Sequence, residues 1–287
     1  MNPCPFLWSV LAALALTCAA RAAEYEAHVF HGPDGKAQPY RLLKPDHYNK
    51  GKRYPLVLLL HGYGERGTDN EKPIKTGSSG ASLFLKNKVR ERFPCFVLVP
   101  QAPGTWVSEP DFNVNQPFRE QPNDSILLAV LTIQALMKRF SVDPDRIYVM
   151  GFSNGGCGTW DLLVRSPKFF AAAVVISGAG DPARITVARH LPIWVFHGAK
   201  DKTVPVARGH DMVAALKKAG GHPIYTEFPT AGHGDAAAEA HRESDLLPWL
   251  FAQDRGKPPV DVSALKRETS STSGAEAKGS KSEAAKD

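Results

Sequence analysis

Cysteine is scarce in this chain. Only four cysteines occur in 287 residues, and only Cys95 and Cys157 lie beyond the first 22 positions. Cys95 begins one predicted strand, whereas Cys157 follows the far end of another, so about 16 Å of strand separates them. A disulfide needs Cα atoms within about 7 Å of each other. We therefore expect two buried thiols and no disulfide.

A strong charge of one sign and metal-ligand spacings are also missing. The formal net charge is +6, and only half of it falls on the part of the chain that is predicted to fold. Such a small excess does not indicate a nucleic-acid partner. The ten histidines show no spacing typical of metal ligands, so we expect no metal site.

One long apolar run stands at residues 6–20, and it is followed by Ala20-Arg21-Ala22. The small-x-small end is typical of a signal-peptide cleavage site, although the residues before the run lack Lys and Arg. The run is shorter than the roughly 20 residues that span a bilayer. We predict a signal peptide at residues 1–22, a secreted or periplasmic protein after its removal, and no membrane partner.

The C-terminal segment 255–287 has no aromatic residue and is dominated by Lys, Glu, Ser, Ala and Gly. Such a segment cannot bury enough apolar surface to offset its chain entropy. We predict a disordered tail there. Because residues 23–254 contain no repeat and no linker, we expect them to form a single domain.

Within that domain, predicted strands alternate with predicted helices, which indicates an α/β fold. Residues 54–60 form an unbroken apolar run, as expected for a strand covered on both faces of a parallel sheet. Residues 24–31 and 37–44 read as a hairpin around Gly32-Pro33-Asp34-Gly35. We predict a mostly parallel central sheet with helices on both faces and an N-terminal antiparallel hairpin. Further strands are predicted at 95–100, 146–150, 170–177, 193–196 and 224–228, and helices at 82–92, 123–140, 153–165, 206–219 and 241–251.

The segment Gly151-Phe152-Ser153-Asn154-Gly155 has the pattern G-x-S-x-G between a predicted strand and a predicted helix. In this context a sharp turn lifts the serine hydroxyl clear of the backbone, and glycines relieve the crowding around it. Ser153 is therefore the candidate nucleophile. The alternative is a glycine-rich turn with an incidental serine.

Two further polar residues follow later predicted strands. Asp201 follows strand 193–196, and His233 follows strand 224–228. The order Ser, Asp, His is that of the α/β-hydrolase triad. A neutral imidazole would take the serine proton, and the carboxylate would fix the tautomer of the imidazole. Asp181 is the rival acid, and His233 could instead be an ordinary loop histidine.

A serine nucleophile also needs an oxyanion hole made of backbone N–H groups. Asn154 directly follows the nucleophile, and Tyr63 lies in the His61-Gly62-Tyr63 turn after the apolar strand 54–60. We predict that these two N–H groups point at the substrate oxygen.

The residues from Leu58 to Asn70, with the sequence LLLHGYGERGTDN, and from Gly151 to Trp160, GFSNGGCGTW, carry a resemblance to a known family. They resemble secreted esterases of the α/β-hydrolase superfamily, in the group labelled predicted peptidase or phospholipase/carboxylesterase, which is related to feruloyl and acetyl-xylan esterases. The resemblance implies an α/β-hydrolase fold, Ser153, Asp201 and His233 as the triad, and no cofactor. It also suggests that Glu65 and its neighbours hold the oxyanion turn.

The substrate is less closely defined. Trp106, Phe112 and Phe118 could wall a cleft for an aromatic or sugar group, with Trp106 as a substrate contact, or they could pin their loop onto the body. We expect a small-molecule or polysaccharide ester, such as an acyl or feruloyl ester. A short-peptide hydrolase is the alternative, followed by a non-catalytic binding protein of the same fold. The sequence does not indicate an oligomeric state.

Overall fold

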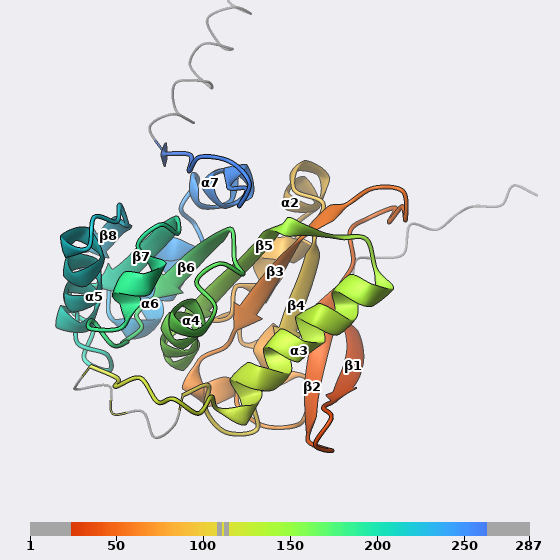
Figure 1. Cartoon of the computed structure of the whole chain (residues 1–287), viewed down its shortest axis with the longest axis horizontal. Coiled ribbons are helices and arrows are strands. Elements are labelled where there is room, and N and C mark those ends of the chain that lie inside the picture. Colours follow the sequence, from red (N-terminus) through yellow and green to blue (C-terminus); the bar gives the residue numbers. More distant parts are fainter. Residues whose placement is uncertain (1–23, 108–110, 112–114, 263–287) are drawn as a thin grey trace, which may run out of the picture.

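The computed structural model describes residues 24–107, 111 and 115–262. Its centre is an eight-stranded sheet in the order β1-β2-β4-β3-β5-β6-β7-β8 (Figure 1). The first two strands form an antiparallel hairpin, β2 also runs antiparallel to β4, and all other neighbours are parallel. The predicted sheet and hairpin are thereby confirmed. The strands are β1 (Glu26–His31), β2 (Ala37–Leu43), β3 (Tyr54–Leu60), β4 (Phe96–Pro100), β5 (Val142–Phe152), β6 (Ala172–Ile176), β7 (Ile193–Gly198) and β8 (Ile224–Phe228).

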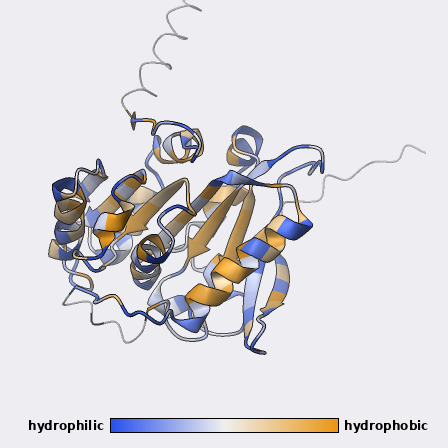
Figure 2. Ribbon diagram, in the orientation of Figure 1, coloured by the Kyte–Doolittle hydropathy of each residue, from blue (hydrophilic) through white to orange (hydrophobic). Residues whose placement is uncertain are grey.

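Helices cover both faces of the sheet. Alternate residues of β3 explain why its sequence is apolar throughout: Leu58 packs with one cluster of side chains, and its neighbour Leu59 packs with the other. The first cluster includes α3 (Asp124–Arg139), α4 (Asn154–Arg165) and α5 (Ala207–Lys218), and the second includes α6 (His233–Ala240) and α7 (Leu246–Ala252). Figure 2 shows that the central strands are largely hydrophobic, whereas the helices around them carry both hydrophobic and hydrophilic residues. Shorter helices are η1 (Tyr63–Glu65), α1 (Lys72–Lys75), η2 (Ala81–Leu85), α2 (Asn87–Arg92) and η3 (Ile185–Ala188).

Two helices differ from the prediction. The segment predicted as one helix at 82–92 is broken at Lys86, whose extended backbone separates η2 from α2. The helix predicted at 241–251 begins only at Leu246, and α6 was not predicted at all. Glycines at 232 and 234 look like a loop in the sequence, yet the Asp235 carboxylate accepts from the Gly232 N–H at 3.2 Å and caps the start of α6.

The two thiols lie as predicted. Cys95 and Cys157 are both buried and free. Burial raises the pKa of each thiol to about 12. Neither is therefore a thiolate at neutral pH, and both act as small packing groups.

Residues 255–262 contact the domain, although they were predicted to belong to the disordered tail. Arg255 pairs with Asp145 at 2.7 Å, and its guanidinium also donates to the Lys168 carbonyl at 2.8 Å. The buried Gln253 amide exchanges two hydrogen bonds with the Val260 backbone, at 2.9 and 3.0 Å. A tail boundary at 255 is therefore too early, since residues up to 262 are held on the domain.

The predicted signal peptide and the rest of the predicted tail, from residue 263, lie outside the described residues. Among the residues that are described, no helix has the length and apolarity needed to cross a bilayer.

We predict that truncation after Asp254 will lower the melting temperature, because it removes the Arg255 ion pair and takes the Val260 N–H away from the Gln253 amide oxygen, while the amide nitrogen keeps the Trp249 carbonyl. An unsatisfied buried amide oxygen costs about 1–3 kcal/mol, which corresponds to about 3–10 °C in a domain of this size. Truncation after Val262 is the matched control and should leave the melting temperature unchanged. Equal melting temperatures for the two truncated proteins would show that residues 255–262 contribute nothing.

Candidate active site

Ser153 occupies the sharp turn between β5 and α4. Its φ of 57° and ψ of −121° are unusual for a residue with a side chain. The flanking glycines make the turn possible: a Cβ on Gly151 would lie 2.1 Å from the Gly155 carbonyl oxygen, and one on Gly155 would lie 2.0 Å from the Leu60 carbonyl oxygen. The turn therefore depends on glycine at both positions, as the sequence pattern predicts.

His233 lies between Ser153 and Asp201. Its Nε2 is 2.8 Å from the Ser153 hydroxyl oxygen, and its Nδ1 is 2.7 Å from Oδ2 of Asp201. An ionised carboxylate can only accept, so Nδ1 carries the proton and Nε2 is left free to accept the serine proton. The structure therefore brings together the three side chains predicted from the sequence. His233 is the first residue of α6, whereas the sequence suggested a loop.

Asp201 is a buried carboxylate with three close hydrogen-bond donors and a second histidine nearby. Oδ1 accepts from the N–H groups of Thr203 and Val204, each at 2.9 Å. Oδ2 faces His233 at 2.7 Å and His197 at 3.5 Å. Burial acts to raise the pKa of Asp201, but the hydrogen bonds from the two histidines and from the Val204 amide outweigh it and hold the pKa far below its usual range. The carboxylate is therefore ionised beside His233 at neutral pH.

Asp181, the rival acid, is engaged elsewhere. Its carboxylate accepts from the backbone N–H groups of Phe118 and Ala183, both at 2.9 Å. It caps the turn after β6 and anchors the loop that carries Phe118. The geometry therefore favours Asp201 as the partner of His233.

Tyr63 and Asn154 each begin a helix, Tyr63 in η1 and Asn154 in α4. The first N–H groups of a helix have no acceptor within that helix. At the start of α4 the helix dipole also favours negative charge. Both predicted oxyanion donors are therefore backbone N–H groups that have no acceptor within their own helices.

Glu65 holds the turn that carries Tyr63. Its carboxylate is buried, accepts from the Gly62 N–H at 2.7 Å, and accepts from the hydroxyl groups of Thr76 and Ser78. The Glu65 carbonyl oxygen in turn accepts from Gln101 at 2.9 Å. As the family resemblance suggests, Glu65 fixes the oxyanion turn through its contacts with the loop.

His61 is buried directly before this turn. Its Nδ1 lies 2.7 Å from the Gly62 carbonyl oxygen, and its Nε2 lies 3.0 Å from the Ala102 N–H. The carbonyl requires a proton on Nδ1, and the N–H requires a lone pair on Nε2, so the ring is neutral. Burial lowers the pKa of His61 to about 4. In the described part of the chain, no group of three or more His, Cys, Asp or Glu side chains is arranged to hold a metal ion.

Trp106 was predicted as a substrate contact, and this prediction is wrong. Its side chain is 0% exposed. The indole N–H donates to the His61 carbonyl oxygen at 2.9 Å, and the backbone N–H donates to Asn154 Oδ1 at 2.9 Å. Phe118 packs against the guanidinium groups of Arg165 and Arg184, and Phe112 lies outside the described residues. The loop-anchoring alternative therefore applies to Trp106.

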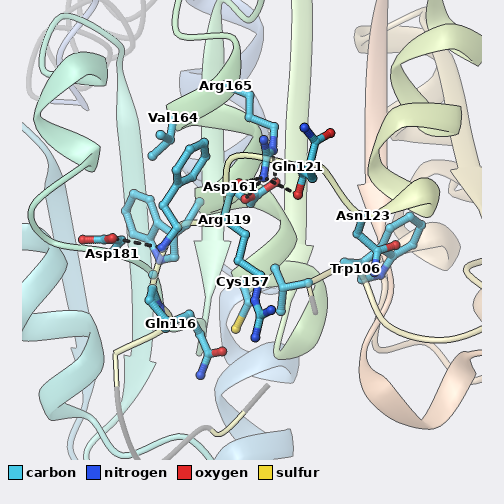
Figure 3. Close-up of a pocket in the computed structure, with 15 residues that line it drawn as sticks. Trp106, Gln116, Arg119, Gln121, Asn123, Cys157, Asp161, Val164, Arg165 and Asp181 are labelled. Atoms are coloured by element: carbon cyan, nitrogen blue, oxygen red, sulfur yellow. Dashed lines mark hydrogen bonds and ion pairs between the residues drawn. The ribbon is translucent and has the colours of Figure 1, made fainter. Parts of the chain in front are cut away.

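Figure 3 shows a pocket beside α4, between Trp106, Cys157 and Asp181. Its cavity volume is about 30 Å³. Asp161 and Arg165, one turn apart on α4, form an ion pair at 2.6 Å in its wall, and burial raises the pKa of Asp161. Among the described residues, the lining of the pocket includes none of Ser153, Asp201 and His233. It is distinct from the triad.

We predict that the folded state loses stability as the pH falls from about 6.5 to 4. His61 is neutral in the folded protein with its pKa near 4, while the unfolded chain binds a proton near pH 6.5. A depression of that size contributes about 3 kcal/mol above pH 6.5, and this is lost by pH 4. The free energy of unfolding, measured in urea across this range, should fall less steeply in His61→Gln than in the wild type. Identical slopes would contradict the assignment of a neutral His61.

Comparison with known proteins agrees with this geometry. Residues 48–241 match the phospholipase/carboxylesterase family. The chain is 29% identical over 215 residues to an Arabidopsis thaliana protein named "Probable carboxylesterase SOBER1-like", covering 68% of this chain and 77% of the relative. A solved thermostable esterase is 35% identical with a TM-score of 0.73; the match covers 80% of this chain and 63% of that one. A ferulic acid esterase with a TM-score of 0.62 is only 15% identical and shows the fold alone. The chain belongs to the phospholipase/carboxylesterase family of the α/β-hydrolases, and it is a serine hydrolase of carboxylic esters.

Proposed function

We propose that this enzyme cleaves carboxylic esters through an acyl-enzyme, with Ser153 as nucleophile, His233 as general base and then acid, and Asp201 as the acid of the triad. The observation that supports this proposal is the continuous relay from the Ser153 hydroxyl to His233 at 2.8 Å and from His233 to Asp201 at 2.7 Å. Contacts of this length are those of a nucleophile and its base.

The relay suits acyl transfer step by step. Ser153 Oγ attacks the ester carbonyl carbon while its proton passes to His233 Nε2. The carbonyl oxygen becomes negative and is stabilised by the N–H groups of Tyr63 and Asn154. The tetrahedral centre then expels the alkoxide, which takes the proton from His233. Water repeats the sequence on the acyl-enzyme, and the acid leaves with Ser153 restored.

Two alternatives are less well supported. A non-catalytic binding protein would not need a hydrogen-bonded relay with an ionised acid behind it. A short-peptide hydrolase would use the same residues, and acylaminoacyl peptidases share the fold at 14% and 16% identity. Those identities carry no substrate information, whereas the curated relatives are named carboxylesterases.

The exposed aromatic ring at the oxyanion turn bears on the substrate. Tyr63 is 46% exposed, although its own N–H is a proposed oxyanion donor. The Arg66 guanidinium carbon lies 3.7 Å from the ring centroid, and Arg66 also donates to the Tyr63 carbonyl oxygen at 2.8 Å. Arg66 thus covers one face of the ring, and the residue that provides a proposed oxyanion N–H also presents an exposed aromatic side chain. We infer an ester with a ring to stack there, such as a feruloyl or sugar ester of a polysaccharide, met outside the cytoplasm after removal of residues 1–22.

The acid of the triad can be tested with a matched pair of variants. Asp201→Asn should lower kcat by about 10⁴, because the amide no longer fixes the tautomer in which Nε2 can take the serine proton. Asp181→Asn makes the same chemical change in the neighbouring loop and should lower kcat by about twofold at most. Both purified proteins should show wild-type circular dichroism. The opposite ranking would move the acid to Asp181.

The substrate inference can be tested with a panel of feruloyl, acetyl-sugar and short aliphatic esters beside peptide amides. The wild type should cleave the esters in preference to the amides. Tyr63→Ala keeps the backbone N–H, and it should lower kcat/KM by about tenfold for feruloyl and sugar esters, since a stacked ring contributes about 1–1.5 kcal/mol. Aliphatic esters should change by about twofold or less. A uniform loss across the panel would contradict a contact between Tyr63 and the substrate ring.

A further inference from the structure

Trp106 contacts both segments that carry the proposed oxyanion donors. The segment from Gln101 to Trp106 follows β4 and runs beside the oxyanion turn and α4. Trp106 is one of the largest fully buried side chains among the described residues. Its burial keeps it out of contact with substrate, yet it donates one hydrogen bond to each of these segments.

The first hydrogen bond fixes the end of β3. The indole N–H of Trp106 donates to the His61 carbonyl oxygen at 2.9 Å, two residues before Tyr63. The His61 ring packs against the indole with centroids 4.9 Å apart, and its Nε2 accepts from the Ala102 N–H at 3.0 Å. The peptide that leads into the oxyanion turn is therefore held from the same short segment on two sides.

The second hydrogen bond fixes the start of α4. The backbone N–H of Trp106 donates to Asn154 Oδ1 at 2.9 Å, and Asn154 is buried. Further along the same helix, a Cβ on Gly158 would lie 2.6 Å from Trp106 Cβ, so the helix and the tryptophan are in direct contact. The residue that provides the second oxyanion N–H is thus held by its own side chain.

We propose that Trp106 is a positioning residue that sets the separation between the Tyr63 and Asn154 N–H groups, an inference that rests on the proposed oxyanion hole. The two donors are about 90 positions apart in the sequence, so tertiary contacts between the ends of β3 and β5 fix their distance. An oxyanion donor acts over about 2.7–3.1 Å, and a site loses rate when its groups shift by about 0.5 Å or more. Trp106 is bonded to both segments, through its indole to His61 and through its backbone N–H to Asn154, so a change in its packing alters the spacing of the hole.

A packing role alone would make a different prediction from a positioning role. A loss of packing lowers the stability of the protein, but each molecule that remains folded keeps the wild-type kcat. A misplaced oxyanion donor lowers kcat and leaves KM almost unchanged, because the developing charge exists only in the transition state. It also weakens a tetrahedral adduct by the same factor as it lowers kcat.

The test compares Trp106→Phe with Trp194→Phe. Trp194 is also buried, and its indole N–H donates to Thr226 Oγ1 at 3.0 Å within the opposite core cluster, so the control loses the same group. Loss of a whole oxyanion donor costs about 10²–10³ in kcat, and a displaced donor should cost about tenfold or more. In Trp106→Phe we expect kcat to fall by about tenfold or more and KM to stay within about twofold of the wild type. A trifluoromethyl ketone forms a hemiketal with the serine, and its affinity should fall by the same factor as kcat. Trp194→Phe should keep wild-type values.

Equal kcat values for the two variants would overturn the proposal. Trp106→Phe removes the indole bond to His61 and keeps the backbone bond to Asn154. Should Trp106→Phe fail to fold, Asn154→Ala removes that second bond, between Trp106 and α4, and an unchanged kcat in that variant would overturn the proposal as well. Ser153→Ala, measured alongside, separates this outcome from a failure of the proposed function. If Ser153→Ala keeps its activity, the acyl-enzyme mechanism is wrong; if it is inactive while Trp106→Phe is normal, only the role of Trp106 is wrong.

Discussion

The structure depends on the close approach of two backbones, at the start of α4 and at the end of β3. Gly155 lies so near the Leu60 carbonyl that a Cβ could not fit between them. This contact places Ser153, which follows the C-terminal end of β5, beside the turn that follows β3. Nucleophile and oxyanion donors come from neighbouring parallel strands, and such strands present their carboxyl ends at one edge of the sheet.

Around this contact, the buried polar groups determine one another's state. Asp201 is kept ionised by its donors, and His61 is kept neutral by burial, which outweighs the effect of the Gly62 carbonyl on its pKa. The Glu65 carboxylate ties the oxyanion turn to the hydroxyl groups of Thr76 and Ser78. Because each group has a fixed partner before substrate arrives, little reorganisation is needed when charge develops. Rigidity of this kind is what the family's ester chemistry requires.

The sequence allowed the sheet and the three triad side chains to be predicted, because their signals are local. An unbroken apolar run marks β3, and glycines at fixed positions mark the Ser153 turn. The role of Trp106 could not be predicted in this way, since its two acceptors, on His61 and Asn154, are distant in sequence. The extent of the C-terminal segment was missed for the same reason, because Arg255 is held by Asp145. Tyr63 was noted for its N–H alone, and its exposed ring became apparent only with the fold.

The most direct test of the central claim, that Ser153 is the activated nucleophile, is labelling with a fluorophosphonate followed by peptide mass spectrometry. Such reagents phosphonylate a serine hydroxyl that has a base beside it. The structure predicts one label per chain, on Ser153, with no label on folded Ser153→Ala. A label on another residue, or an unlabelled wild-type protein that nevertheless hydrolyses esters, would contradict the assignment.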